Sequence, residues 1–184
     1  AESKDETYLP YKRDAKLVRD WAVPGTPGLE HRIGGLEKED LTGNVSYDPD
    51  NHQKMVKVRA EKVQRIAEDL PPMTINAGAV SGKVMVLGWG STFGAIQTAV
   101  ESLLEQGYEV GHAHLRYLNP LPKNLGDLLK GFDEVLIPEM NDGQLVNLIQ
   151  ARYLKECVAF DKIKGIPFTA KEIEDKVKSI YPES

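Results

Sequence analysis

The fold of this chain is decided by the stretch KVMVLGWGST, residues 83–92. Its first half is a short apolar run of the kind that forms a buried β-strand, and its second half is a glycine-rich turn. Apolar side chains then recur at helical spacing over residues 92–106, with Ser91 or Thr92 suited to cap the start and Gly107 suited to the left-handed position after the end. A strand, a tight turn and an amphipathic helix in this order predict an α/β domain.

The same alternation continues towards the C-terminus. We expect strands over residues 83–87, 109–114, 133–137 and 157–163, and helices over residues 92–106, 123–130, 142–155 and 169–180. Such alternation favours a mostly parallel sheet that helices cover on both faces. The sequence therefore predicts a three-layer α/β domain over residues 73–184, with residues 73–82 as a connecting stretch.

The N-terminal part has a different pattern. Turn-forming residues crowd it, as in VPGTPG at residues 23–28 and in the Gly34–Gly35 pair, and its apolar residues follow neither a helix period nor a strand period. Scattered apolar side chains of this kind are typical of a segment that lies across another surface. We therefore expect an irregular arm that becomes ordered on contact.

A helix is expected to follow the arm over residues 50–70. Asp50 or Asn51 is placed to cap it, and Pro71–Pro72 ends it. Its apolar residues fall roughly on one face and its charged residues on the other, which favours a solvated amphipathic helix over a dedicated binding helix. Residues 1–72 are thus predicted to hold the arm and one linking helix.

Composition limits the classes of function. The chain has 184 residues, 41% of them hydrophobic and 28% charged, with a formal net charge of −5. These values are typical of a soluble folded protein, and the lack of a basic stripe argues against nucleic-acid binding. We find no apolar run long enough to span a bilayer and no secretory signal, so we expect no membrane contact and a cytoplasmic location.

The single cysteine and the first residue add two expectations. Cys157 excludes an internal disulfide and cannot by itself hold an iron–sulfur cluster. Any such cluster must then sit on another chain. Because the sequence begins with Ala1 rather than a methionine, we interpret it as a piece of a longer protein.

The turn GWGSTFG, residues 88–94, occupies the place where α/β proteins hold a phosphate. Its glycine spacing differs from the dinucleotide fingerprint, and the second strand is not followed by an acidic residue that would hold a ribose, which disfavours NAD. Arg116 is placed to meet the extra phosphate of NADP. Two interpretations stay open, an NADP-binding protein and a tight turn packed at a domain contact, and we favour the second.

Two further groups of polar residues are notable. His112 and His114 share one face of a strand, but no third metal ligand is evident, so we interpret them as polar groups of a partly exposed strand or of an interface. Asn141 and Gln144 have the spacing of a capping box, which would place them, with Glu139, at the carboxyl edge of the sheet. A purely structural role and a partner contact are equally compatible with this edge.

Candidate interface residues follow from these patterns, and we find no catalytic unit. The candidates are Trp89, Ser91, Thr92, Arg116, Glu139, Asn141 and Gln144. The sequence has no nucleophile elbow, no phosphate-binding loop of the Walker type and no thiamine diphosphate motif.

Several segments together resemble a known family. They are GLEHRIGGLE (28–37), YDPDNHQKM (47–55), RAEKV (59–63), LGWGST (87–92), HLRYLNPLP (114–122) and PEMNDGQL (138–145). In this order they resemble the alpha subunits of 2-oxoglutarate:ferredoxin oxidoreductases, of the 2-oxoacid:acceptor oxidoreductase family. The likeness covers nearly the whole chain, but only the C-terminal part of such a subunit, which is similar to the transketolase C-terminal domain.

The resemblance implies a reaction and a set of partners. The family decarboxylates a 2-oxoacid on thiamine diphosphate, passing the acyl group to coenzyme A and electrons to ferredoxin. It implies that thiamine diphosphate, magnesium and the iron–sulfur cluster lie elsewhere in the complex, and that this piece binds no cofactor and has no turnover alone. Its expected task is structural, through contacts with the rest of the alpha subunit, the beta subunit or a second alpha subunit.

Three residues of the arm are candidates for reaching towards the substrate. They are Glu30, His31 and Arg32. An arginine suits a substrate carboxylate, and the neighbouring glycines allow a close approach of the backbone. The alternative is salt bridging at the surface or between domains.

Overall fold

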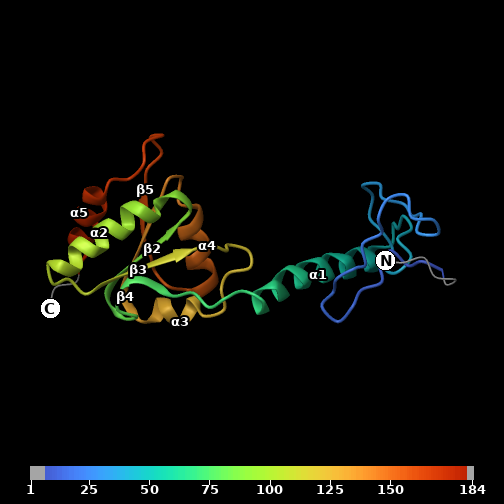
Figure 1. The fold of residues 1–184 in the computed structure, drawn as a ribbon, viewed down its shortest axis with the longest axis horizontal. Coiled ribbons are helices and arrows are strands. Elements are labelled where there is room, and N and C mark those ends of the chain that lie inside the picture. Colours follow the sequence, from blue (N-terminus) through green and yellow to red (C-terminus); the bar gives the residue numbers. More distant parts are fainter. Residues whose placement is uncertain (1–6, 182–184) are drawn as a thin grey trace. The chain divides into compact units, whose positions relative to one another are not determined.

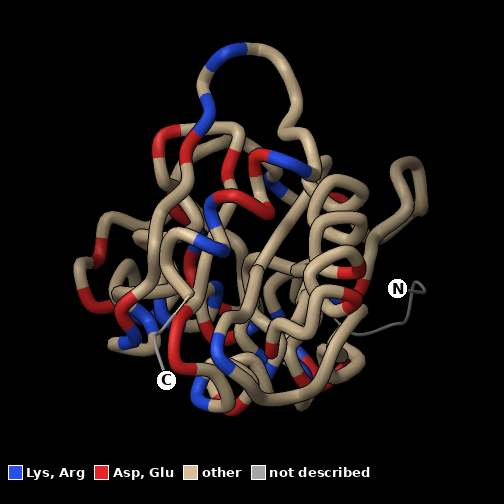
Figure 2. Tube along the Cα trace, turned by 90° about the vertical axis from the view of Figure 1, so that its left-hand side faces the viewer, with Lys and Arg blue, Asp and Glu red and all other residues tan. Residues whose placement is uncertain are grey.

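The computed structural model describes residues 7–181, which form two compact units that meet in sequence between Asp69 and Leu70 (Figure 1). The first unit consists of an irregular segment and one long helix. The second unit is an α/β domain. Lys and Arg are interspersed with Asp and Glu along the described trace (Figure 2).

Helix α1 (Pro49–Arg65) dominates the first unit and continues as the 3₁₀ turn η1 (Ile66–Glu68). The Asp48 carboxylate caps it by accepting hydrogen bonds from the amides of Asp50 and Asn51, at 2.8 and 3.4 Å. The predicted cap at Asp50 or Asn51 is therefore wrong. Pro49 lacks an amide donor and suits the first helical position, which leaves Asp48 as the cap.

Polar contacts hold the irregular segment together. Its ladder pairing is limited, in residues 7–48, to the isolated bridges Arg13–Arg19 and Lys38–Val45. Asp40 accepts from Arg13 at 2.7 Å and from Lys54 of α1 at 2.6 Å. The Lys38 ammonium is buried and donates to the carbonyls of Gly34 and Leu36 at 2.5 and 2.6 Å. Charges and carbonyl groups therefore order this unit where regular strands are missing.

The second unit contains a five-stranded sheet of order β1-β3-β2-β4-β5. The strands are β1 (Ile75–Gly78), β2 (Gly82–Trp89), β3 (Val110–Leu115), β4 (Phe132–Glu139) and β5 (Val158–Asp161). All neighbours pair in parallel except β1, which runs antiparallel to β3. This confirms the predicted mostly parallel α/β fold.

Strand β1 is the element that the sequence did not predict. Residues 73–82 were expected to connect the helix to the sheet, but Ile75–Gly78 forms an edge strand. The strand has only four residues, two of which are the poor strand formers Asn76 and Gly78. Pairing with β3 therefore stabilises this strand despite the low strand propensity of its residues.

Helices cover both faces of the sheet, as predicted. On one face α2 (Phe93–Glu105) and α5 (Ala170–Ile180) pack against alternate residues of β2 such as Val84 and Val86. On the other face α3 (Leu125–Lys130) and α4 (Gln144–Tyr153) pack against Met85 and Leu87. The two apolar clusters make the three layers seen in Figure 1. Within residues 7–181, the helices are too short or too polar to cross a membrane.

Candidate functional site

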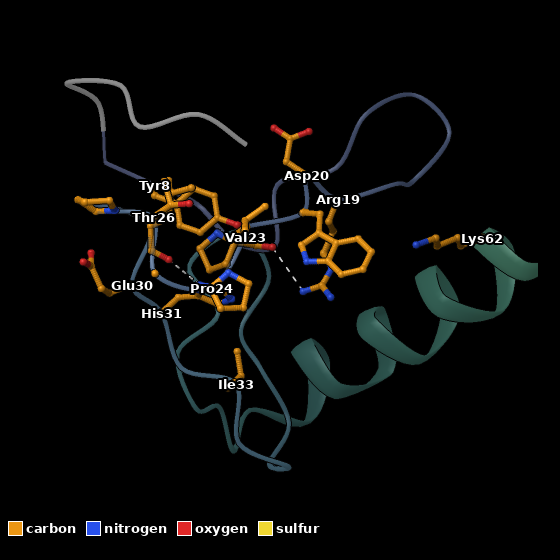
Figure 3. Close-up of a pocket in the computed structure, with 16 residues that line it drawn as sticks. Tyr8, Arg19, Asp20, Val23, Pro24, Thr26, Glu30, His31, Ile33 and Lys62 are labelled. Atoms are coloured by element: carbon orange, nitrogen blue, oxygen red, sulfur yellow. Dashed lines mark hydrogen bonds between the residues drawn. The ribbon is translucent and has the colours of Figure 1, made fainter.

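A cavity of about 640 Å³ lies within the first unit (Figure 3). Glu30 and His31 both line it, together with residues that the sequence did not assign to a substrate site, including Tyr8, Arg19, Trp21 and Lys62. The members come from positions far apart in the chain. A cavity assembled in this way leaves no local signal in the sequence.

His31 is held in place at the wall of this cavity. Its ring packs edge-on against Tyr8 with centroids 5.4 Å apart. Its Nδ1 lies 2.8 Å from the carbonyl oxygen of Leu29, so Nδ1 carries the proton of that hydrogen bond. The ring thus has a fixed tautomer while it is neutral.

Arg32 differs from the other two predicted residues. It does not line the cavity, its side chain is exposed, and it makes no hydrogen bond or ion pair within residues 7–181. Glu30 and His31, which are neighbours in sequence, therefore both line the cavity, and Arg32 does not. Contact of any of them with a substrate stays a prediction.

The turn between β2 and α2 is tighter than predicted. Strand β2 continues to Trp89, and the 3₁₀ turn η2 (Gly90–Thr92) begins at the next residue, where Gly90 has a φ of +60°. The buried Thr92 hydroxyl donates to the Trp89 carbonyl at 2.9 Å and accepts from the Trp89 amide at 3.3 Å. Thr92 occupies the N-cap position of α2, but its side chain caps no amide of that helix. The expected side-chain cap is therefore absent.

The space beside Gly88 in this turn is already occupied. A Cβ atom at this position would lie 2.4 Å from Cδ1 of Ile96 and 2.9 Å from Nδ1 of His114. The space beside the glycine is filled by the domain's own side chains. This packing disfavours the interpretation as an NADP-binding protein, and Gly88 lets α2 pack closely on the sheet.

His112 and His114 face the same side of β3, as their alternation predicted. Their rings lie 5.7 Å apart, and both contact Phe93 at about 5 Å, with centroid distances of 5.1 and 5.0 Å. His112 is fully buried, which corrects the expectation of a partly exposed strand. In residues 7–181, no group of three or more potential metal ligands comes together.

Burial controls the charge of His112. Its Nδ1 lies 2.7 Å from the Oε1 of Gln97 on α2, so Nδ1 carries the proton. Its Nε2 is buried and has no hydrogen-bond partner within the described chain. Burial, with a smaller effect from His114, lowers the pKa of His112 to about 4. The ring is therefore neutral at pH 7.

The start of α4 differs from the predicted capping box. The N-cap is Gly143, with a φ of +74°, rather than Asn141. Asn141 still accepts from the Gln144 amide at 2.9 Å. Glu139 is fully buried, and its carboxylate accepts from the amides of Leu145 and Val146 at 2.7 and 2.8 Å. Glu139 thus satisfies the first turn of the helix from the end of β4.

The parallel strands bring the predicted interface residues to one edge of the sheet. Thr92 and Glu139 are buried and bonded within the domain, whereas the other five have exposed or half-buried side chains, namely Trp89, Ser91, Arg116, Asn141 and Gln144. This edge can present aromatic, cationic and amide groups to a neighbour. A partner contact through them stays a prediction.

Comparisons with known proteins agree with the resemblance found in the sequence. Residues 82–175 match the family model for pyruvate:ferredoxin oxidoreductase core domain II. The chain is 43% identical over 169 residues to the 2-oxoglutarate oxidoreductase subunit KorA of Mycobacterium tuberculosis, covering 91% of this chain and 26% of that protein. It is 28% identical over 170 residues to the 2-oxoglutarate synthase subunit KorA of Methanocaldococcus jannaschii, covering 91% of this chain and 45% of that protein.

A solved structure is also similar. It is that of a 2-oxoglutarate:ferredoxin oxidoreductase from Magnetococcus marinus, with 2-oxoglutarate, coenzyme A and succinyl-CoA bound. The TM-score is 0.87 at 28% identity, and the match covers 97% of this chain and 32% of that one. The chain spans less than half the length of each of these three relatives. The family match and these likenesses place the chain in the 2-oxoacid:ferredoxin oxidoreductase family, to which it belongs through core domain II.

Proposed function

We propose that this chain is the C-terminal part of the alpha subunit of a 2-oxoglutarate:ferredoxin oxidoreductase. In that assembly it supports oxidative decarboxylation of the 2-oxoacid to an acyl-CoA through contacts with the rest of the alpha subunit and with the beta subunit. Coenzyme A and ferredoxin interact with the complete enzyme rather than with this chain alone. The likeness to alpha subunits that are two to four times longer supports the proposal.

One observation carries the structural role. The first unit exposes large apolar side chains on its irregular segment: Trp21 is 80% exposed, Ile33 84% and Tyr47 87%. A contact that removes side chains of this size from water is favourable. They suit an arm that lies against another part of the enzyme.

The cofactors are assigned to other parts of the assembly. The family resemblance implies that thiamine diphosphate and its magnesium ion are held elsewhere in the complex. The buried, lone Cys157 likewise does not suit an iron–sulfur cluster. We therefore place thiamine diphosphate, magnesium and the cluster outside this chain.

Glu30, His31 and Arg32 are proposed to lie near the substrate. The cavity that holds Glu30 and His31 also contains the cations Arg19 and Lys62. Arginine and lysine groups of this kind suit the carboxylates of a 2-oxoacid. Arg32 follows the cavity-lining residue His31 in the sequence. Its side chain is exposed and makes no hydrogen bond or ion pair within the described residues.

Reconstitution tests the proposal. The chain is co-expressed with the remaining alpha segment and the beta subunit, and reduction of a viologen dye is followed with 2-oxoglutarate and coenzyme A. We expect the complex to be active, Ile33→Asp to prevent its assembly, and the matched control Ile33→Leu to leave it intact. Full activity without this chain, or normal assembly with Ile33→Asp, would contradict the proposed role.

A further inference from the structure

A small polar cavity lies in the second unit, where β1 begins and β3 ends. Its volume is about 200 Å³. Polar groups from Thr74, Asn76, His114, Arg116 and Tyr117 line it, and Met73 with nearby prolines completes the wall. It is separate from the filled space beside Gly88 and from the cavity of the first unit.

The charges of this cavity favour an anion. Arg116 supplies a permanent positive charge, and no Asp or Glu is among the lining residues. Arg116 is exposed and has no acidic partner within residues 7–181. A guanidinium presents several donors in one plane, which matches the oxygens of a carboxylate or phosphate.

The neutral groups can also donate to an anion. Asn76 has an amide NH₂, and Thr74 and Tyr117 have hydroxyl groups. Tyr117 is 42% exposed, so the mouth of the cavity is open to solvent. A single cation surrounded by neutral donors is the composition expected of a site for one oxyanion.

An irregularity in the backbone of β1 places one of these donors at the cavity. The register of β1 against β3 shifts between Ile75 and Ala77, so Asn76 is the extra residue of a β-bulge. Bulges redirect a side chain at a sheet edge, and Asn76 lines the cavity. On the adjoining segment, the Asn124 side chain accepts from the Met73 amide at 2.9 Å and donates to its carbonyl at 2.8 Å.

His114, which also lines the cavity, is held in place by its neighbours. Its ring packs edge-on against Phe93, with centroids 5.0 Å apart. Its Nδ1 lies inside the domain, on the Gly88 side. The cavity walls are therefore held by pairing, hydrogen bonds and ring packing before any ligand arrives.

We propose that this cavity binds one oxyanion group, a phosphate or a carboxylate, of a small molecule. Pockets for whole ligands usually measure about 300–1,000 Å³, so a cavity of this size accommodates a single charged group rather than a complete coenzyme. The site goes beyond the structural role proposed above and does not depend on it. It also requires no nucleotide contact at Gly88.

The bound anion would change the ionisation of His114. Burial, together with the positive charge of Arg116, lowers the pKa of this ring in the free protein, partly offset by a backbone interaction with Gly90. A negative group in the cavity opposes the effect of Arg116 and favours the protonated ring. The pKa of His114 is therefore expected to rise when the site is filled.

The test uses the 184-residue chain and two probes, inorganic phosphate and succinate, at constant ionic strength. Binding is followed by calorimetry and by NMR titration of the His114 ring. We expect at least one probe to saturate the site and raise the His114 pKa. Arg116→Gln should weaken that binding about tenfold or more, because it removes a charge-assisted contact.

Matched variants separate the site from general electrostatics. Arg152→Gln removes the same charge from an exposed arginine of α4 that does not line the cavity, and it should leave binding nearly unchanged. Asn76→Ala keeps Arg116 and should weaken binding several-fold. Saturation by phosphate alone would identify a phosphoryl group, and saturation by succinate alone a carboxylate.

Three results would overturn the proposal. They are failure of both probes to bind, equal weakening by Arg116→Gln and Arg152→Gln, and binding that leaves the His114 resonance unmoved. If neither probe binds and Arg116→Gln instead blocks assembly with the beta subunit, Arg116 serves a protein contact and not a small-molecule site.

Discussion

The two units of the chain hold their structures by different means. The second unit buries two apolar clusters on either side of its sheet, and many of these side chains are fully inaccessible. In the first unit the buried apolar side chains, among those described, are only Pro10, Leu29 and Met55. Ion pairs and buried carbonyl contacts of Arg13, Lys38 and Asp40 take the place of a core. The second unit therefore has the apolar core that determines a fold, whereas we propose that the first is completed by a neighbour.

The largest expected difference between the units concerns apolar side chains. Leu87→Ala removes a fully buried side chain from the second unit and should lower the free energy of unfolding by about 2–5 kcal/mol. Ile33→Ala, at a position that is 84% exposed, should change it by about 0.5 kcal/mol or less. Denaturant unfolding followed by Trp89 fluorescence, with Trp21 replaced by Phe, measures the first change. Equal sensitivity at both positions would contradict the comparison.

Above about pH 5.5, where carboxyl groups stay ionised, the pH dependence of stability should reside mainly in the second unit. In the folded chain the pKa of His112 is about 4, below the ordinary value of 6.5. Between these two pH values the unfolded chain binds a proton at His112 that the folded chain does not bind. Stability is then complete above pH 6.5 and is lost as the pH falls towards 4, by about 3 kcal/mol in total.

Two variants check this dependence. His112→Leu should remove much of the change between pH 6.5 and 5.5, a window in which ordinary carboxyl groups stay almost fully ionised. His52→Gln, at an exposed histidine of the first unit, serves as the control and should retain it. The measurement is the denaturation midpoint at each pH. A His112→Leu variant with the wild-type pH profile would show that other groups carry the effect.

A smaller effect is expected from the ion pairs of the first unit. Asp40→Asn weakens the contacts with Arg13 and Lys54, which should cost about 1 kcal/mol, and less in high salt. The change should appear in the fluorescence of Trp21 and not in that of Trp89. A loss that is independent of salt, or that appears at Trp89, would remove the distinction between the units.

The smallest effect is expected at Cys157. Burial raises the pKa of this thiol to about 11, so little thiolate exists at pH 7. Iodoacetamide should leave the folded chain almost unlabelled and should label it quickly in denaturant. Mass spectrometry measures the labelled fraction, and rapid labelling of the folded chain would show that β4 and β5 open more readily than their packing suggests.

Local signals in the sequence predicted most of the second unit. The apolar run at Lys83–Leu87 and the helical spacing after it are properties of neighbouring residues, and the structure confirms the strand and the helix. Strand β1 escaped prediction because Asn76 and Gly78 disfavour a strand, and only pairing with β3 forms it. The burial of His112 escaped for a similar reason, since its partner Gln97 comes from a different element.

The candidate sites were less predictable. Placement of Glu30 and His31 in one cavity depends on Tyr8, Arg19 and Lys62, which lie far away in sequence. The capping role of Glu139 depends on the path of the chain between β4 and α4. Distances along the sequence do not show such contacts. The sequence therefore identified candidate residues better than it predicted their contacts and structural roles.

Hydrogen exchange of the chain alone and in the assembled oxidoreductase tests the central claim most directly. We expect the amides around Trp21, Ile33 and Tyr47 to exchange quickly in the isolated chain and to become protected on assembly. The amides of β2 and β4 should be protected in both states. Unchanged exchange of the arm on assembly would contradict the account that a neighbouring part of the enzyme completes the first unit.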